Sequence, residues 1–136
     1  MWFSRLILAI SGLAFGAYGV YCTANPHFAA KQIGYAMSNS SEVVEVMAMY
    51  GGLQLALGLI FLFCAVKQQW IIPGLACVAI CTLCLASTRG IGISLHGADN
   101  YNLGALAYEA SSAVLATVAW LLERKALSEG IRQTAQ

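Results

Sequence analysis

Apolar residues dominate four long windows of this chain, and polar residues gather in the short segments between them. The windows cover residues 4–22, 43–66, 70–90 and 103–123. Each is close to the roughly 20 residues that a helix needs to cross the hydrocarbon core of a bilayer. Because lipid offers no partners to the backbone, the windows predict helices and exclude an open sheet. We therefore predict an all-α membrane protein with one domain over residues 1–136, in which four transmembrane helices form an antiparallel bundle. We expect residues 128–136 to form a flexible tail.

The composition supports a membrane location and excludes several other classes. Hydrophobic residues make up 60% of the chain and charged residues 10%, whereas ordinary soluble domains have about 25% charged residues. Seven basic and six acidic residues are too few to cover the surface of a soluble domain. A net charge of +1 also provides no basic stripe for phosphate, so we expect no nucleic-acid partner.

The basic residues are distributed unevenly between the two sides of the predicted bundle. Lys31 and Arg89 fall on one side, and five basic residues fall on the other: Arg5, Lys67, Arg124, Lys125 and Arg132. Since Lys and Arg are enriched in cytoplasmic flanks, both termini are predicted to be cytoplasmic.

Two helix starts are predicted in the segment before the second window. Asn25-Pro26 favours the end of the first helix and the start of a short one. That helix would lie on the membrane surface through an apolar side made of Phe28, Ile33, Ala36 and Met37. Asn39 followed three residues later by Glu42 resembles a capping box and predicts the start of the second span.

Small residues form two ladders at helical spacing. Gly12, Gly16 and Gly19 share one face of the first predicted helix, and a second ladder in the next helix comprises Ala48, Gly52 and Ala56. Such ladders let two helix backbones approach closely in lipid. We expect these faces to pack together, either within one bundle or between subunits.

A polar cluster is predicted inside the membrane. Glu109 lies within the fourth window on a face of small residues, and a lone carboxylate there would need a partner. Arg89, near the end of the third window, is the natural one. Tyr50 and Gln54 of the second window lie at a similar depth, so the four residues are expected to meet. The pair either fixes helix register or belongs to a functional site for a ligand or proton.

Evidence for catalysis, metals or cofactors is weak. His96 and Glu109 together would suit proton transfer near neutral pH. Cys77, Cys81 and Cys84 lie on one face of an apolar helix and are interpreted as small hydrophobic filler. Short catalytic motifs are missing. We therefore assign no catalytic residue and expect no metal or cofactor.

Several of these residues also occur in a resemblance to a known family. The run Met49–Leu59 begins with Met49-Tyr50-Gly51-Gly52, and Arg89-Gly90, Gly97 and Tyr108-Glu109 follow it. Over about residues 45–125, this pattern resembles the small four-helix membrane family named domain of unknown function 4345, which is similar in layout to the DoxX-like group. The family often has an acidic residue where this chain has His96. The resemblance implies a multi-pass protein of the bacterial inner (plasma) membrane with no established activity, and it lends weight to Tyr50, Arg89 and Glu109.

Three functions fit the sequence. The ladders and the missing motifs favour a non-catalytic module, a homo-oligomer or accessory subunit that binds membrane lipid, quinone or a partner membrane protein. A proton-coupled permease for small solutes would use Tyr50, Arg89 and Glu109 as its polar path. A membrane-embedded enzyme acting on a lipid or isoprenoid would use Glu109 or His96 as acid and base, and Arg89 to hold an anionic group.

Overall fold

The computed structural model describes residues 2–134, and these form helices joined by short turns, with no strand among them. Four stretches are long and apolar enough to cross a membrane: Trp2–Ala24, Ser40–Val66, Gln68–His96 and Asn100–Gly130. Each contains one of the predicted windows, which confirms an all-α protein with four membrane-spanning helices. The last helix continues to Thr134, so the segment predicted as a flexible tail is helical up to that residue. Residues 135 and 136 lie outside the described part.

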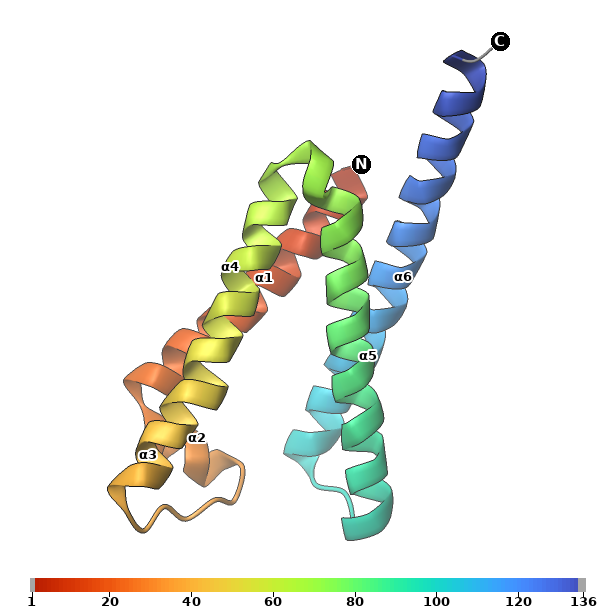
Figure 1. Ribbon diagram of the computed structural model, residues 1–136. Helices are drawn as coiled ribbons and strands as arrows, with labels where there is room; N and C mark the ends of the chain where they lie inside the picture. Colours follow the sequence, from red (N-terminus) through yellow and green to blue (C-terminus); the bar gives the residue numbers. More distant parts are fainter. Residues whose placement is uncertain (1, 135–136) are drawn as a thin grey trace. The chain divides into compact units, whose positions relative to one another are not determined.

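The chain divides into two compact units, each of which is described by itself. One unit is Ala9–Phe63, and the other comprises Met1–Leu8 together with Cys64–Gln136. The first unit holds most of α1 (Trp2–Ala24), α2 (Pro26–Gln32), α3 (Ser40–Val46), a π-helical segment (Met47–Gly52) and most of α4 (Leu53–Val66). The second unit holds a 3-10 turn (Gln68–Trp70), α5 (Ile71–His96) and α6 (Asn100–Thr134) (Figure 1). One domain of four helices stays a prediction.

Glycines allow α1 and α4 to approach closely within the unit Ala9–Phe63. A methyl group placed on Gly58 would lie 2.6 Å from the Cα of Gly16 and 2.8 Å from the carbonyl oxygen of Gly12. A methyl group on Gly19 would lie 2.8 Å from the carbonyl oxygen of Gly51. Real side chains do not tolerate such distances, so these positions are restricted to glycine by direct backbone contact.

The residues of the second spanning helix that meet the Gly12 ladder differ from those predicted. Ala48, Gly52 and Ala56 are exposed, whereas Gly51 and Gly58 are buried against α1. The predicted spacing of four assumed an uninterrupted α-helix. The π-helical segment Met47–Gly52 forms i→i+5 hydrogen bonds and so inserts a residue into the turn. A face followed at intervals of four is therefore lost across it.

The segment between α1 and α4 shows both predicted helix starts and one difference: α2 begins at Pro26 and α3 at Ser40. The side chain of Asn39 accepts a hydrogen bond from the backbone N–H of Glu42, so the capping prediction is confirmed. The surface helix is shorter than expected, because Gly34 has φ +75° and the Tyr35 N–H donates back to the Ala30 carbonyl. This is a C-terminal cap that only glycine adopts readily. The helix α2 ends at Gln32, so Ala36 and Met37 lie beyond it.

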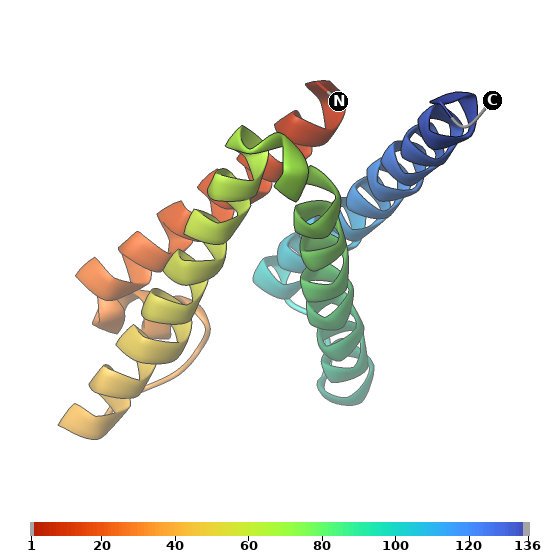
Figure 2. The ribbon, with the colours of Figure 1, turned by 45° about the horizontal axis from the view of Figure 1, so that its top comes forward.

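In the second unit α5 and α6 pack against each other near their connection and diverge toward the C-terminal end of α6 (Figures 1 and 2). The face of α6 turned inward carries mostly small residues: Glu109, Ser112, Ala113, Ala116 and Ala119 are buried. Alanine and serine on this face let the α5 backbone approach closely. The predicted small-residue face around Glu109 is thus the packed one.

The first turns of α1 belong to the same unit and bind three other segments: the end of α4, the 3-10 turn and α6. Arg5 Nη1 donates to the carbonyl oxygens of Ala65 and Val66 at 3.2 and 3.3 Å, which satisfies two of the unpaired carbonyls at the end of α4. Arg5 Nη2 donates to Gln68 at 2.8 Å. The buried hydroxyl of Ser4 donates to Glu123 of α6 at 2.6 Å. The first turns of α1 are thereby anchored within the unit that contains the candidate site.

Candidate functional site

A three-residue turn connects α5 to α6 and sets the register between them. Gly97 follows the last residue of α5 with φ +96°, a conformation that favours glycine. Asp99 then begins α6 as its N-cap: its carboxylate accepts from the backbone N–H of Asn102 at 2.7 Å and from the Asn102 side chain at 2.8 Å. The two helices are therefore held antiparallel by a short connection with a hydrogen-bonded cap at each end.

This register brings Arg89 of α5 opposite Glu109 of α6. Arg89 lies eight residues before Gly97 and Glu109 lies nine after Asn100, or roughly 12 and 14 Å along their helices at 1.5 Å per residue. Arg89 Nε donates to Glu109 Oε2 at 2.8 Å, and Arg89 Nη2 donates to Oε1 at 2.7 Å. This is the paired, two-bond geometry for which guanidinium is suited. The pairing expected from the sequence is present.

Asn102 links the ion pair to the helix cap. Its side-chain oxygen accepts from Arg89 Nη1 at 2.8 Å, while its side-chain nitrogen donates to Asp99. The amide thus has a partner on both sides, and a continuous chain of hydrogen bonds runs from Asp99 through Asn102 and Arg89 to Glu109. Sequence reasoning missed Asn102. The signal was its place three residues after the helix cap, where its side chain faces back along α6.

The residues joined by these hydrogen bonds differ in burial and in charge. The Glu109 side chain is 7% exposed and that of Arg89 is 24% exposed, so the carboxylate depends on the guanidinium for compensation. Asp99 lies outside the spanning helices, and the hydrogen bonds from Asn102 hold the pKa of its carboxyl below the ordinary value. Among the described residues no buried side-chain nitrogen or oxygen lacks a hydrogen-bond partner. The buried polar side chains of the hairpin therefore have hydrogen-bond partners within the protein.

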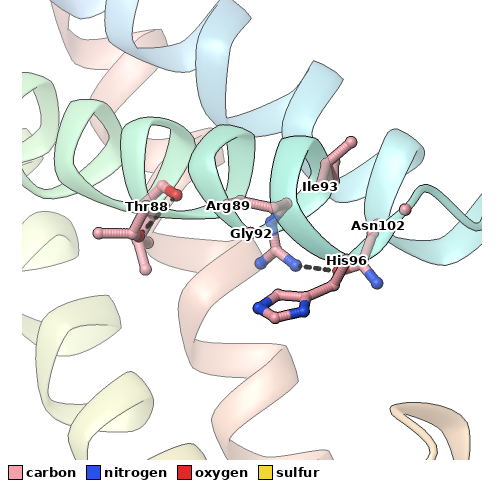
Figure 3. A pocket seen from close by; sticks show the side chains of 8 residues that line it. Thr88, Arg89, Gly92, Ile93, His96 and Asn102 are labelled. Atoms are coloured by element: carbon pink, nitrogen blue, oxygen red, sulfur yellow. Dashed lines mark hydrogen bonds between the residues drawn. The ribbon is translucent and has the colours of Figure 1, made fainter.

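A pocket of about 370 Å³ opens beside Arg89 on α5. Its wall includes Thr88, Arg89, Ile93, His96 and Asn102, together with the bare backbone at Gly92 and Gly97. Figure 3 shows the His96 ring, the Arg89 guanidinium and Asn102 on one side of the helix. The volume lies within the 300–1,000 Å³ typical of small-molecule sites. His96 and Arg89 therefore line the same pocket, and a role of His96 with Glu109 in proton transfer stays a prediction.

The other predicted members are placed as follows. Tyr50 is exposed in the π-helical segment and Gln54 is half-buried in α4. Both belong to the unit Ala9–Phe63, and Arg89 and Glu109 belong to the other. A cluster of all four therefore stays a prediction.

The three cysteines of α5 do not form a site. Cys77 and Cys84 are exposed, Cys81 is half-buried, and all three are free thiols. In the part of the chain that the structure describes, no group of three His, Cys, Asp or Glu residues is placed to hold a metal ion.

The fold and the site together define a class: a small polytopic helical membrane protein with an arginine–carboxylate pair buried inside a helical hairpin. The chain belongs to the family described as Domain of unknown function (DUF4345), whose family model matches residues 3–121. This match confirms the resemblance and extends it from the last three helices to the first. No curated protein and no solved structure matches the chain.

Proposed function

We propose that this protein is a non-catalytic membrane module, a homo-oligomer or accessory subunit that binds lipid, quinone or a partner membrane protein. The observation that carries the proposal is the closed hydrogen-bond chain in the α5–α6 hairpin. Arg89 is engaged by Glu109 and Asn102, and Asp99 is engaged by Asn102. These side chains stabilise the hairpin itself.

The same series of hydrogen bonds argues against the two alternative functions, a permease and a membrane-embedded enzyme. A permease or an enzyme would require Glu109 to exchange protons or Arg89 to bind an anionic substrate. Both oxygens of Glu109 accept from one guanidinium, and the carboxylate is 7% exposed. Either activity would first have to break a bidentate ion pair in a medium of low dielectric, which is costly.

Exposed small residues support association with another helix. Ala48, Gly52 and Ala56 are each exposed in the second spanning helix, and the nearest atom to a methyl group on Gly52 would be the Met47 carbonyl oxygen at 3.9 Å. A partner helix can approach the backbone closely at small exposed residues. We propose these residues as the contact with a second subunit or a partner protein.

The cellular setting is part of the proposal. We place the protein in the bacterial inner membrane with both termini cytoplasmic, supported by the excess of basic residues near Arg5, Lys67 and Arg124. A cytoplasm-active reporter fused after residue 136 should be active, and a periplasm-active reporter there should be silent. The opposite pattern would contradict the orientation.

Native mass spectrometry of protein released directly from its membrane tests the function. We expect a homo-oligomer, a partner protein or bound lipid or quinone, and a bare monomer would overturn the proposal. Gly52→Leu should abolish the protein–protein species because the side chain blocks close approach. Gly104→Leu is the matched control, since Gly104 is an exposed helical glycine with no atom near its Cβ position.

A further inference from the structure

The pocket beside Arg89 has a defined direction along α5. Leu85, Arg89, Gly92 and His96 follow one helix face, at intervals of four, three and four residues. The pocket therefore extends over about 16 Å, since each helical residue rises 1.5 Å. Asn102 of α6 adds a wall near the turn.

The two ends of the pocket wall differ in polarity. Leu85 lines the end farthest from the turn, Thr88 and Arg89 follow it along α5, and Ile93 adds apolar surface beyond them. His96, Asn102 and the backbone of Gly97 line the end next to the turn. Gly92 leaves the middle open, because nothing lies within 4 Å of its Cβ position. A molecule with a polar head at the turn and an apolar chain directed toward Leu85 matches these two ends, with Thr88 and Arg89 lining the wall between them.

The charges around the pocket disfavour an anionic head. Arg89 and Glu109 neutralise each other as an ion pair. Asp99 is ionised at neutral pH, as an ordinary aspartate is, and the hydrogen bonds from Asn102 hold the pKa of its carboxyl lower still. The nearest fixed charges therefore sum to a negative value when His96 is neutral, and an anion would also compete with Glu109 for Arg89.

We propose that this pocket binds an uncharged amphiphile whose carbonyl, ester or hydroxyl oxygen accepts a hydrogen bond from His96 beside the Arg89 guanidinium, with its apolar chain along Ile93 and Leu85. This inference rests on the proposed function and specifies the class of ligand and its site. A lipid ester, a quinone and an isoprenoid alcohol share this chemistry.

Binding of short-chain probes to the purified, delipidated full chain tests the charge requirement. Dioctanoylglycerol and dioctanoyl phosphatidic acid carry the same acyl chains and differ in the charge of the head. Native mass spectrometry at graded probe concentrations measures the dissociation constant of each. We expect dioctanoylglycerol to bind at least about tenfold more tightly. Equal binding, or tighter binding of phosphatidic acid, would overturn the proposal. A short-chain quinone and farnesol, measured alongside, identify which source of uncharged head binds best.

Two substitutions test the location. Gly92→Leu fills the open middle of the pocket and should weaken dioctanoylglycerol binding about tenfold or more. Gly90→Leu is the matched control, because Gly90 lies on the same helix outside the pocket and also has nothing within 4 Å of its Cβ position. His96→Phe keeps a ring but removes the donor, and should weaken binding by roughly three- to tenfold. Equal affinity in the unmodified protein and Gly92→Leu would overturn the site.

The outcomes separate this inference from the proposed function. Probe binding that is insensitive to Gly92→Leu, in a protein that retains its oligomer or partner, removes the pocket assignment alone. A bare monomer released from the native membrane removes the proposed function, whatever the probes do.

Discussion

Arg89 and Glu109 lie 20 residues apart in the sequence and join α5 to α6 by two parallel hydrogen bonds of 2.8 and 2.7 Å. The pair neutralises two charges that would otherwise be unpaired inside the membrane. It also places a guanidinium in the wall of the pocket beside His96. A single contact thus contributes to both the stability of the hairpin and the chemistry of the candidate site.

Arg89→Ala should destabilise the protein more than the double variant Arg89→Ala with Glu109→Gln. The single change leaves a buried carboxylate without its partner, which costs about 3–5 kcal/mol when a buried pair is broken. The double change leaves an uncharged amide instead. Unfolding in mixed detergent micelles measures both free energies. Equal losses in the two variants would show that the residues do not interact in the folded protein.

Gly58→Ala should destabilise the unit Ala9–Phe63. The new methyl group would lie 2.6 Å from the Cα of Gly16, so α1 and α4 must separate, at a cost of about 1–3 kcal/mol. Gly52→Ala is the control, because its methyl group meets no atom closer than 3.9 Å. The same unfolding assay compares them. If the control loses as much unfolding free energy as Gly58→Ala, the result would argue against the packing of the Gly58 face on α1.

Asp99 should make stability depend on acid pH. Its folded-state pKa is depressed by hydrogen bonds from Asn102, so its contribution is fully present above the unfolded pKa of about 3.9 and is lost as the pH falls through the folded pKa. Asp99→Ser keeps a capping side chain but cannot ionise. When thermal unfolding is measured between pH 7 and pH 3, the melting temperature of the unmodified protein should therefore fall more steeply below pH 4 than that of Asp99→Ser. Parallel curves would contradict this role.

Arg5→Lys should destabilise the unit that contains the site while preserving the charge on which orientation depends. Arg5 bonds to two backbone carbonyls and to Gln68 at once, whereas an ammonium group is a point charge without that fork. We expect a loss of about 1–2 kcal/mol. A reporter fused after residue 136 should show unchanged orientation. Unchanged stability would mean that these contacts contribute little in detergent.

The sequence predicts the helices well because each spanning segment is a long apolar window, and apolar length is a physical requirement of the bilayer. It also predicts the Arg89–Glu109 pair, since two charges inside such windows must compensate each other. It does not reveal that Ala48, Gly52 and Ala56 are exposed while Gly51 and Gly58 pack on α1, because a π-helical turn depends on backbone contacts that residue spacing does not show. It misses Asn102 because a polar residue near a helix start is usually only part of the cap. It misses the pocket because the space at Gly92 results from the absence of a side chain, and the sequence does not show which neighbours leave that space empty.

The short turn between α5 and α6 also bears on how the protein enters its membrane. Inserted alone, either helix would carry one uncompensated charge at a cost of about 2.5–3.5 kcal/mol. Three residues separate His96 from Asn100, so the second helix follows the first out of the ribosome at once and brings the opposite charge within reach. We therefore expect the hairpin, rather than the single helix, to be the unit that partitions into lipid during biogenesis, and a long insertion in this turn to delay pairing and hinder integration.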